Sequence, residues 1–224
     1  MHRDTRKTAE YFGAYIVYQI GRIEKFEGVL RNLNKENMAQ RLQCHMFLAN
    51  FYQDLLLAEY SSGSSIDLLK RVYTKYLSHI GPQNALTYDT AVNALSWAVL
   101  LDVKDRVALD SIHYPQDGML DAFYHYLVGD SSPNDAGALS IASSASEPFV
   151  QSLTGKMSPE DLNRYIKNDW YRNNRDTSWY ESDKRDTNTY CGYWCLAGAA
   201  VVKIMQWDPF VFANTAYFPT DLLL

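Results

Sequence analysis

Two of the three cysteines lie in the most apolar stretch of the sequence, YCGYWCLAGAAVVKIM, which runs from Tyr190 to Met205. Cys191 and Cys195 are four residues apart, so on a helix both thiols can project from one face and supply half of a zinc site. Zinc needs two further ligands, and the five histidines lie in other segments without a ligand-like spacing. Because free cysteine is also common in protein cores, we predict buried thiols, no metal site and no cofactor.

Three other patterns resemble reactive or ligand-binding sites only in part. Cys44 and His45 have the types of a nucleophile and its base, but neighbours on a helix point in different directions and form no ready dyad. SLTGKMS around Gly155 lacks the first glycine and the final Ser or Thr of a phosphate-binding loop. The polar turn at 130–135 resembles a calcium loop, but the twelfth position from Asp130 is Ile141 instead of glutamate. These patterns therefore predict neither catalysis nor nucleotide or calcium binding.

Carboxylates gather in the middle of the sequence. Between Asp102 and Glu147 there are eight acidic and two basic residues, and we call this range the acidic segment. A nucleic-acid-binding protein needs a basic surface instead, so we predict no nucleic-acid partner. Acids beside exposed aromatic rings suit a protein interface, because the acids steer a basic partner and the rings supply contact area. The candidate binding residues are Asp102, Asp105, Asp110, Asp117, Asp121 and Asp130, with Phe123, Tyr124 and Tyr126 as anchors if they are exposed.

Two alternatives remain open for the acidic segment. Asp117 and Asp121 can act as catalytic carboxylates of a helical enzyme if they converge in a pocket. The segment can also be a solvated helix face of a general helical scaffold protein.

The elements that position these residues are predicted to be helices. Apolar residues recur at intervals of three to four along most of the chain, and no segment reads as a strand. We expect long helices over 5–33 and 35–59, the second capped by Asn34 and ended by SSGSS at 61–65. The short connection favours antiparallel packing of the two. Ser65 should cap a third helix, which GPQN at 81–84 ends.

The rest of the chain is predicted to be helical as well. Further helices are expected over 88–101, 104–112, 116–128 and 138–153, and a later one has Ser158 as its cap and Pro159 in its first turn. The predicted fold class is therefore all-α, a multi-helix array. The polar loop at 129–137, which begins and ends with glycine, separates an N-terminal helical region, 1–128, from a C-terminal helical region, 138–224, in what we expect to be one compact unit.

The stretch from Tyr190 to Met205 is expected to be a helix that is apolar on every side, because Lys203 is its only charged residue. Such a helix is surrounded by protein. Gly198 costs about 1 kcal/mol relative to alanine in a helix interior, which indicates a closely packed neighbour. The run is shorter than the ~20 apolar residues that cross a bilayer, so we predict a buried C-terminal core helix and no membrane span.

A second aromatic-rich stretch, residues 168–186, reads NDWYRNNRDTSWYESDKRD. It places Trp170, Tyr171, Trp179 and Tyr180 among charges of both signs. We interpret it as packing at the rim of the core, with arginine stacked on the rings, and the alternative is a ligand site.

Bulk composition is that of a globular protein. The chain has 224 residues, 47% of them hydrophobic, and a formal net charge of −5, which is ample for a continuous core. Three cysteines are too few for a disulfide framework, and no signal peptide opens the sequence. We therefore expect a protein of the reducing cytoplasm.

Three segments resemble the C-terminal half of the PoNi family of immunity proteins: Trp170 through WYESDK at 179–184, then YCGYWCLAGAAVVKIM, and finally YFPTDLL at 217–223. The shared features are a Trp-Tyr pair, a Tyr-x-Gly-Tyr-Trp start of the apolar stretch and a closing Tyr-x-Pro-x-Asp-Leu. The N-terminal half is similar more loosely, through its paired long helices and LSWAVLLDV. The motif residues, which we expect to be mainly structural, are Trp170, Trp179, Tyr190, Gly192, Tyr193, Trp194, Pro219 and Asp221.

The resemblance implies an all-helical bacterial immunity protein without enzymatic activity. Such a protein binds and neutralises its cognate PoNe-type DNase toxin, a secreted effector of interbacterial competition that we expect to be encoded next to it. Two positions depart from the family: Ala197 stands where glutamate is expected, and Asp183 where histidine is frequent. A catalytic or metal role at these positions is therefore not implied here. The sequence leaves the oligomeric state open.

The charge distribution fits this partner independently. A DNase must present basic surface to DNA, and an acidic helical protein can cover that surface in place of the phosphates. We therefore expect stoichiometric inhibition through the acidic segment.

Overall fold

The computed structural model describes residues 2–81, 86–103, 109, 112, 123, 126–127, 129 and 144–224. Within these ranges the regular structure is helical and includes no strand, which confirms the predicted fold class. The chain separates into two compact units. Unit 1 comprises Met1–Ala85, Ser111–His113 and Glu181–Gly192, and unit 2 comprises Leu86–Asp110, Tyr114–Tyr180 and Tyr193–Leu224. Of the predicted boundary loop at 129–137 only Gly129 is described, so that boundary stays a prediction.

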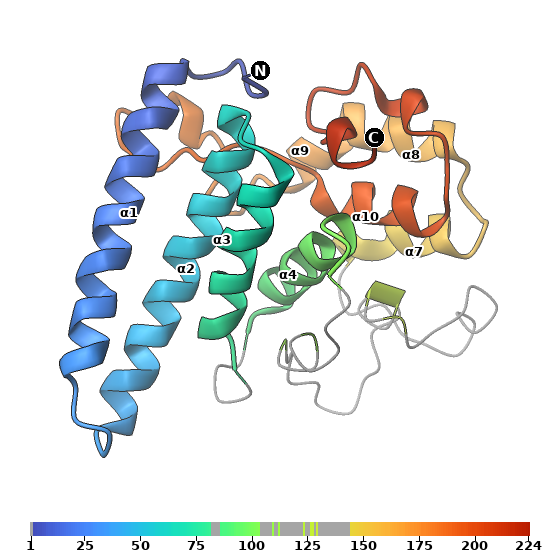
Figure 1. The fold of residues 1–224 in the computed structure, drawn as a ribbon. Helices are drawn as coiled ribbons and strands as arrows, with labels where there is room; N and C mark the ends of the chain where they lie inside the picture. The colour runs from blue at the N-terminus through green and yellow to red at the C-terminus, as the bar shows by residue number, and fades with distance from the viewer. Residues whose placement is uncertain are drawn as a thin grey trace. The chain divides into compact units, whose positions relative to one another are not determined.

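Unit 1 is built on three helices that lie side by side (Figure 1): α1 (Ala9–Asn32), α2 (Met38–Ser62) and α3 (Ile66–His79). α2 packs against both of the others and runs antiparallel to α1. The short segment η4 (Ser182–Lys184) belongs to the same unit.

The ends of these helices follow from local sequence, with one correction. The Ser65 hydroxyl accepts from the Leu68 backbone N–H at 3.3 Å and caps α3, as predicted. α2 begins three residues later than expected, because Asn37 supplies its cap. The side chain of Asn34 instead accepts from the backbone N–H of Glu36, in the turn that precedes the helix.

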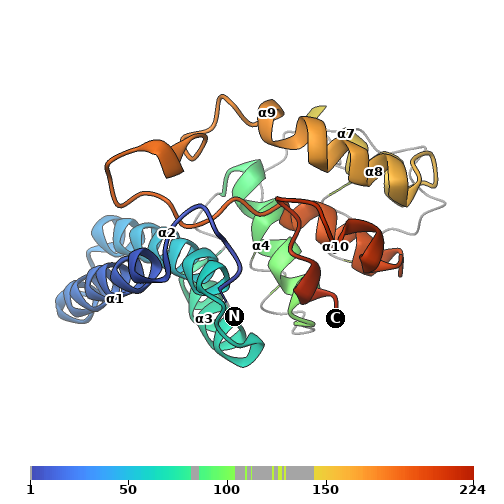
Figure 2. The ribbon, with the colours of Figure 1, turned by 90° about the horizontal axis from the view of Figure 1, so that it is seen from above.

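Unit 2 contains α4 (Tyr88–Leu100), α7 (Glu147–Leu153), α8 (Pro159–Tyr165) and α10 (Leu196–Ile204), and Figure 2 shows α4 beside α10. Ser158 caps α8 through the Asp161 backbone N–H at 3.2 Å, as predicted. The helices predicted over 104–112 and 116–128 fall almost entirely outside the described residues. Shorter segments of the unit are η2 (Ser144–Ser146), η3 (Ile166–Trp170), α9 (Tyr171–Asn173), η5 (Pro209–Phe212) and η6 (Thr220–Leu222).

The apolar stretch near the C-terminus is helical only in its second part. α10 begins at Leu196, so the expected helix from Tyr190 is wrong for its first six residues, and the two thiols do not share a helix face. Gly192 has φ 121°, which breaks a helix and which residues with a side chain rarely adopt. The Cys195 N–H donates instead to the Tyr217 carbonyl at 2.7 Å. The first seven residues of α10, from Leu196 to Val202, are buried.

Gly198 packs closely against neighbouring side chains. This confirms the prediction made from its unfavourable position inside a helix. A Cβ built at this position would lie 2.8 Å from Cδ1 of Ile166 and 3.6 Å from Cε1 of Phe149. Both neighbours are buried, so their side chains have little room to move. The same Cβ would lie 3.0 Å from Sγ of Cys195, so a side chain at this position would force its neighbours in unit 2 to shift.

Candidate functional site

Asp102 is the one member of the predicted acidic site that the described residues include. It follows α4 with φ 55°, and its carboxylate forms an ion pair with Nζ of Lys203 at 2.9 Å. Nζ of Lys203 also donates to the Leu100 carbonyl at 3.0 Å. The Asp102 side chain is 61% exposed, so the pair adds at most about 1 kcal/mol to stability.

The other predicted acids and one predicted anchor lie outside the described residues, and their assignment to the binding site stays a prediction. They are Asp105, Asp110, Asp117, Asp121, Tyr124 and Asp130.

The remaining two anchor candidates do not meet the condition of exposure. Phe123 is fully buried and stacks on Phe149 with ring centroids 5.4 Å apart. Tyr126 is only 4% exposed. The spacing of aromatic and acidic residues indicated that some rings serve the core, but it did not identify which ones. Phe123 and Tyr126 are core residues of unit 2.

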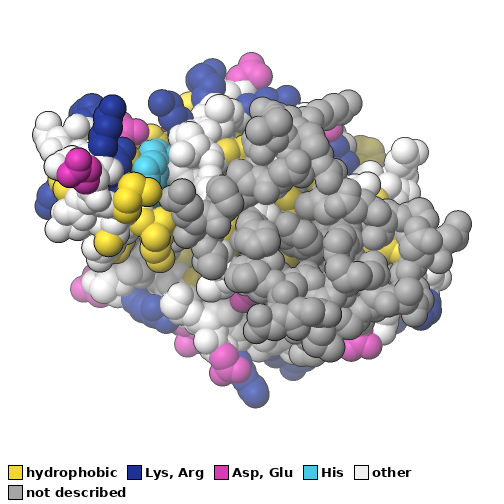
Figure 3. All heavy atoms as spheres, turned by 90° about the horizontal axis from the view of Figure 1, so that it is seen from below, with side chains coloured by type: hydrophobic (Ala, Val, Ile, Leu, Met, Phe, Trp, Pro, Cys, Tyr) yellow, Lys and Arg dark blue, Asp and Glu magenta, His cyan; other side chains and the backbone are white. Residues whose placement is uncertain are grey.

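The formal charge is divided unevenly between the two units. Unit 2 contains fifteen acidic and eight basic residues, and unit 1 contains eleven acidic and thirteen basic residues. Unit 2 therefore carries the net negative charge of the protein. The described part of the face in Figure 3 shows both signs interspersed.

Six aromatic rings pack together in unit 2, and we call them the aromatic cluster. Tyr171 stacks on Tyr217 with ring centroids 5.0 Å apart and on Tyr180 with centroids 4.6 Å apart. Trp170 stacks on Trp179 with centroids 5.7 Å apart. The Tyr193 ring contacts both Tyr171 and Trp179. Its members are Trp170, Tyr171, Trp179, Tyr180, Tyr193 and Tyr217.

The aromatic cluster brings together three segments that are distant in sequence, so it is first a structural element. Tyr193 is buried, while Tyr171, Trp179 and Tyr180 are half-buried. This graded exposure matches the predicted packing at the rim of the core. Three other motif residues of this unit lie outside the cluster: Pro219 is buried, Trp194 is half-buried and Asp221 is exposed.

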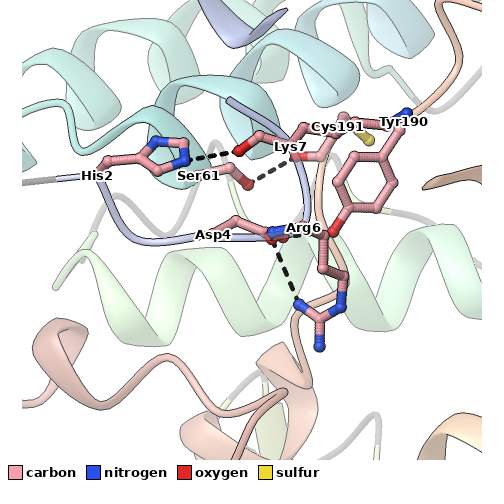
Figure 4. A network of polar contacts seen from close by, with 7 residues as sticks. All are labelled: His2, Asp4, Arg6, Lys7, Ser61, Tyr190 and Cys191. Carbon is pink, nitrogen blue, oxygen red and sulfur yellow. Dashed lines mark hydrogen bonds and ion pairs between the residues drawn. The ribbon is translucent and has the colours of Figure 1, made fainter. Parts of the chain in front are cut away.

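Tyr190 and Gly192 belong to unit 1. Tyr190 takes part in a polar network that joins residues 2–7, Ser61 of α2 and Cys191 (Figure 4). The Tyr190 phenol donates to the buried Asp4 carboxylate, which Arg6 contacts at 3.4 Å. The Ser61 hydroxyl donates to the Cys191 carbonyl at 2.7 Å. Sequence reasoning missed this network because its partners are far apart in the chain.

The hydroxyl of Tyr11, on α1, also anchors the backbone of Tyr190. The Tyr11 phenol donates to the Tyr190 carbonyl at 3.0 Å and accepts from the Tyr190 N–H at 3.1 Å. A hydroxyl that uses both its donor and its acceptor on one residue's backbone replaces the hydrogen bonds that a helix would have supplied.

The cysteine thiols are poorly suited to nucleophilic chemistry. Burial raises the pKa of Cys195 to about 12. Burial, together with the nearby Asp54 carboxylate, also raises the pKa of Cys191, whose thiol is surrounded by protein although the residue keeps some exposed surface. Both thiols therefore stay protonated at neutral pH, and the thiolate is the form that attacks or binds zinc. Within the described ranges, no three residues among His, Cys, Asp and Glu converge to hold a metal ion.

Two histidines of unit 1 form a pair that the sequence did not indicate. Nδ1 of His45 on α2 lies 3.1 Å from Nδ1 of His79 on α3, and His79 stacks on Tyr52. Burial is the main cause that lowers the pKa of His79 to about 4, and His45 lowers it further while Glu27 opposes the shift. Burial also lowers the pKa of His45. At neutral pH the pair is uncharged and shares one proton between the facing nitrogens.

The helices of the described ranges include none with both the length and the apolar character that a membrane span requires.

Comparison with known proteins gives a match to both halves of one family. The model of the N-terminal part of PoNe immunity proteins (PoNi) matches residues 3–112, and the model of their C-terminal part matches residues 119–222. A search of curated proteins finds no match. Among solved structures, the crystal structure of protein PA2201 from Pseudomonas aeruginosa is similar at a TM-score of 0.68 and 17% identity, over 100% of this chain and 90% of that one. At this identity the likeness concerns the fold alone.

Proposed function

Because this chain belongs to the PoNi family of PoNe immunity proteins, we propose that it protects its cell by binding a PoNe-type DNase toxin in a stoichiometric complex. The family match, which extends over nearly the whole chain, is the observation that carries this proposal. The toxin would be encoded beside it, and the complex would form in the cytoplasm, where the DNA substrate is.

The charge distribution supports unit 2 as the toxin-binding unit. Its fifteen acids against eight bases match the basic surface that a nuclease presents to DNA. Opposite charge accelerates encounter and selects the partner, while the contact area supplies most of the affinity. The acidic segment accounts for eight of these acids, so it is the proposed steering surface.

The contact area must come from side chains other than Phe123 and Tyr126, because both are buried. Tyr124 remains a candidate anchor. The half-buried Tyr171, Trp179 and Tyr180 of the aromatic cluster are further candidates, because tyrosine and tryptophan at a core rim combine fixed rings with accessible area. An anchor in this cluster would enter the interface with little loss of side-chain entropy, since neighbouring rings already hold it.

Inhibition in this proposal needs no turnover. The raised pKa values of Cys191 and Cys195 argue against a thiol nucleophile. Asp117 and Asp121, on which the alternative of an enzyme depends, lie outside the described residues. The family match favours an immunity protein over this alternative and over a general scaffold.

Co-expression with the neighbouring nuclease tests the proposal. The pair should co-purify, light scattering should give a fixed stoichiometric ratio, and the purified complex should leave plasmid DNA intact. The nuclease released from the complex by denaturation and refolded alone should degrade the same DNA. Failure to co-purify, or a complex with full nuclease activity, would contradict the proposed function.

A further inference from the structure

Residues 181–192, which we call the strap, belong to unit 1, although the chain on either side of them belongs to unit 2. The chain leaves unit 2 after Tyr180, passes through unit 1 and returns to unit 2 at Tyr193. The backbone has a positive φ at both passages, 55° at Glu181 and 121° at Gly192. A left-handed conformation is unfavourable for glutamate, so it persists only where the surrounding structure fixes it.

The two positions that flank the strap are held in the aromatic cluster of unit 2. Tyr180 stacks on Tyr171 with ring centroids 4.6 Å apart, and the centroid of the Tyr193 ring lies 5.1 Å from that of the same Tyr171 ring. Just beyond Tyr193, the Cys195 N–H donates to the carbonyl of Tyr217, another member of the cluster, at 2.7 Å. Tyr193 and Cys195 are buried. The aromatic cluster thus closes the strap into a loop.

The last residues of the strap are held inside unit 1. The Tyr190 phenol donates to the Asp4 carboxylate, and the Ser61 hydroxyl donates to the Cys191 carbonyl at 2.7 Å (Figure 4). Tyr11 exchanges two hydrogen bonds with the Tyr190 backbone. We call these four hydrogen bonds the strap network. Asp4, Ser61 and Tyr190 are buried, so their polar groups lose these partners if the strap leaves unit 1.

An ordered loop costs conformational entropy, and the two sets of contacts share that cost. While the strap network holds the loop in unit 1, its two ends stay at the separation that the aromatic cluster needs, so closing the cluster requires little further ordering. If the strap leaves unit 1, its twelve residues regain their freedom, and the cluster must close a flexible loop against that entropy.

We infer that the strap couples the two units: the strap network in unit 1 and the aromatic cluster in unit 2 stabilise each other, so opening of one loosens the other. A coupling of this kind is reciprocal. If the rings of the cluster contact the toxin, as proposed above, toxin binding also orders the strap network. This consequence rests on the proposed function, whereas the coupling itself is measured without the nuclease.

Amide hydrogen exchange of the full chain, followed by NMR, tests the coupling. The Cys195 N–H reports on unit 2, because its acceptor is the carbonyl of a cluster residue. Tyr190→Phe keeps the ring and removes the donor to Asp4, so it loosens the strap in unit 1. We expect exchange of the Cys195 amide to become about tenfold faster in this variant. Ser61→Ala removes the donor to the Cys191 carbonyl and should act in the same direction, so it serves as the test variant if Tyr190→Phe does not fold.

Tyr52→Phe is the matched control within unit 1. It also removes a phenol that donates to a carboxylate, that of Glu27 at 2.8 Å, but the two residues lie on α2 and α1 and outside the strap network. Urea unfolding measures the stability of each variant, so that exchange is compared at an equal loss of stability. Tyr52→Phe should change the exchange rate of the Cys195 amide by less than about twofold.

The reverse direction of the coupling is tested from unit 2. Tyr171→Leu removes the ring that contacts both flanking tyrosines. It should therefore accelerate exchange of the Tyr190 N–H, which donates to the Tyr11 hydroxyl in unit 1. Phe149→Leu removes a ring of unit 2 outside the aromatic cluster and should leave that exchange unchanged.

Three results would overturn the inference. One is exchange of the Cys195 amide that neither Tyr190→Phe nor Ser61→Ala accelerates. Another is equal acceleration by Tyr190→Phe and Tyr52→Phe at the same loss of stability, since unit 2 would then respond to unit 1 as a whole and not to the strap. The third is unchanged exchange of the Tyr190 amide in Tyr171→Leu, because a thermodynamic coupling must act in both directions.

Discussion

The Tyr190 phenol donates a hydrogen bond to the Asp4 carboxylate, which joins two residues that are 186 positions apart in the chain. Asp4 is almost completely buried, and the contact lies inside unit 1. A buried carboxylate needs such donors, because burial without them costs several kcal/mol. The contact therefore holds the segment that leads into Cys191 against the N-terminal residues.

Replacing Tyr190 with phenylalanine should destabilise the protein. The ring still fills its space, but the Asp4 carboxylate loses a buried donor, so the free energy of unfolding should fall by about 1–3 kcal/mol. Urea denaturation measures the change. Tyr18→Phe is the matched control, since the Tyr18 side chain is 46% exposed and its substitution should change stability by less than about 0.5 kcal/mol. Equal effects of the two variants would contradict a structural role for the hydrogen bond.

The histidine pair predicts a loss of stability in mild acid. The pKa of His79 in the folded state is about 4, below the ordinary value of about 6.5, so the unfolded chain binds its proton more readily. The stabilising contribution is present above about pH 6.5 and declines as the pH falls towards 4. His45 is half-buried, so solvent screens part of the charge. We expect a loss on the order of 2 kcal/mol.

Unfolding in urea between pH 7 and pH 5 checks this expectation, with His79→Gln as the non-titrating variant. Asp54 also titrates in this range, because burial raises its pKa to about 6, and its effect has the opposite sign. The difference between wild type and variant removes that contribution. The stability of His79→Gln should depend less steeply on pH, and parallel curves would show that the pair does not control acid stability.

Gly198→Ala should destabilise unit 2 although alanine is the better helix former. Its Cβ would lie 2.8 Å from Cδ1 of Ile166, which is fully buried and has little room to move. Overpacking of this kind costs about 1–3 kcal/mol, which exceeds the gain in helix propensity of about 1 kcal/mol. Thermal unfolding of the single variant gives the size of the effect.

Ile166→Val provides the test of cause, because it removes the Cδ1 atom that the new methyl group would meet. Alone it should cost about 0.5–1.5 kcal/mol. In combination with Gly198→Ala the total loss should be smaller than the sum of the two single losses. Additive losses would mean that another contact opposes the methyl group.

Charge reversal in the acidic segment should slow toxin binding. Changing Asp110, Asp117 and Asp121 to lysine removes opposite charge from the proposed steering surface, so the association rate should fall by about tenfold and depend less on salt, while helicity stays unchanged. Stopped-flow or surface-based kinetics at several salt concentrations measure both effects.

A matched control makes the same change of total charge in unit 1. Glu36, Asp67 and Asp186 are exposed there, and their reversal to lysine should slow association much less. Equal slowing in the two triple variants would indicate that total charge alone controls association. Unchanged kinetics in the first variant would exclude the acidic segment as the steering surface.

The sequence by itself determined the features that depend on near neighbours in the chain. Helical spacing predicted α1 to α4, and Ser65 and Ser158 marked helix starts because a capping hydroxyl needs only the backbone N–H three residues ahead. Gly198 predicted a close neighbour because its cost in a helix is local. The motif residues of the C-terminal half identified the family, which the match to both of its parts confirmed.

Only the tertiary structure decided what depends on distant partners. Residues 190–195 contain no charged residue, yet they are not helical. The Tyr190 backbone bonds to the Tyr11 hydroxyl and the Cys195 N–H bonds to the Tyr217 carbonyl, so backbone partners set the start of α10. Burial of Phe123, and the meeting of His45 with His79, likewise depend on which elements pack together. A pattern of residue types indicates that a side chain needs a partner, but only the packing of the folded chain determines which residue that partner is.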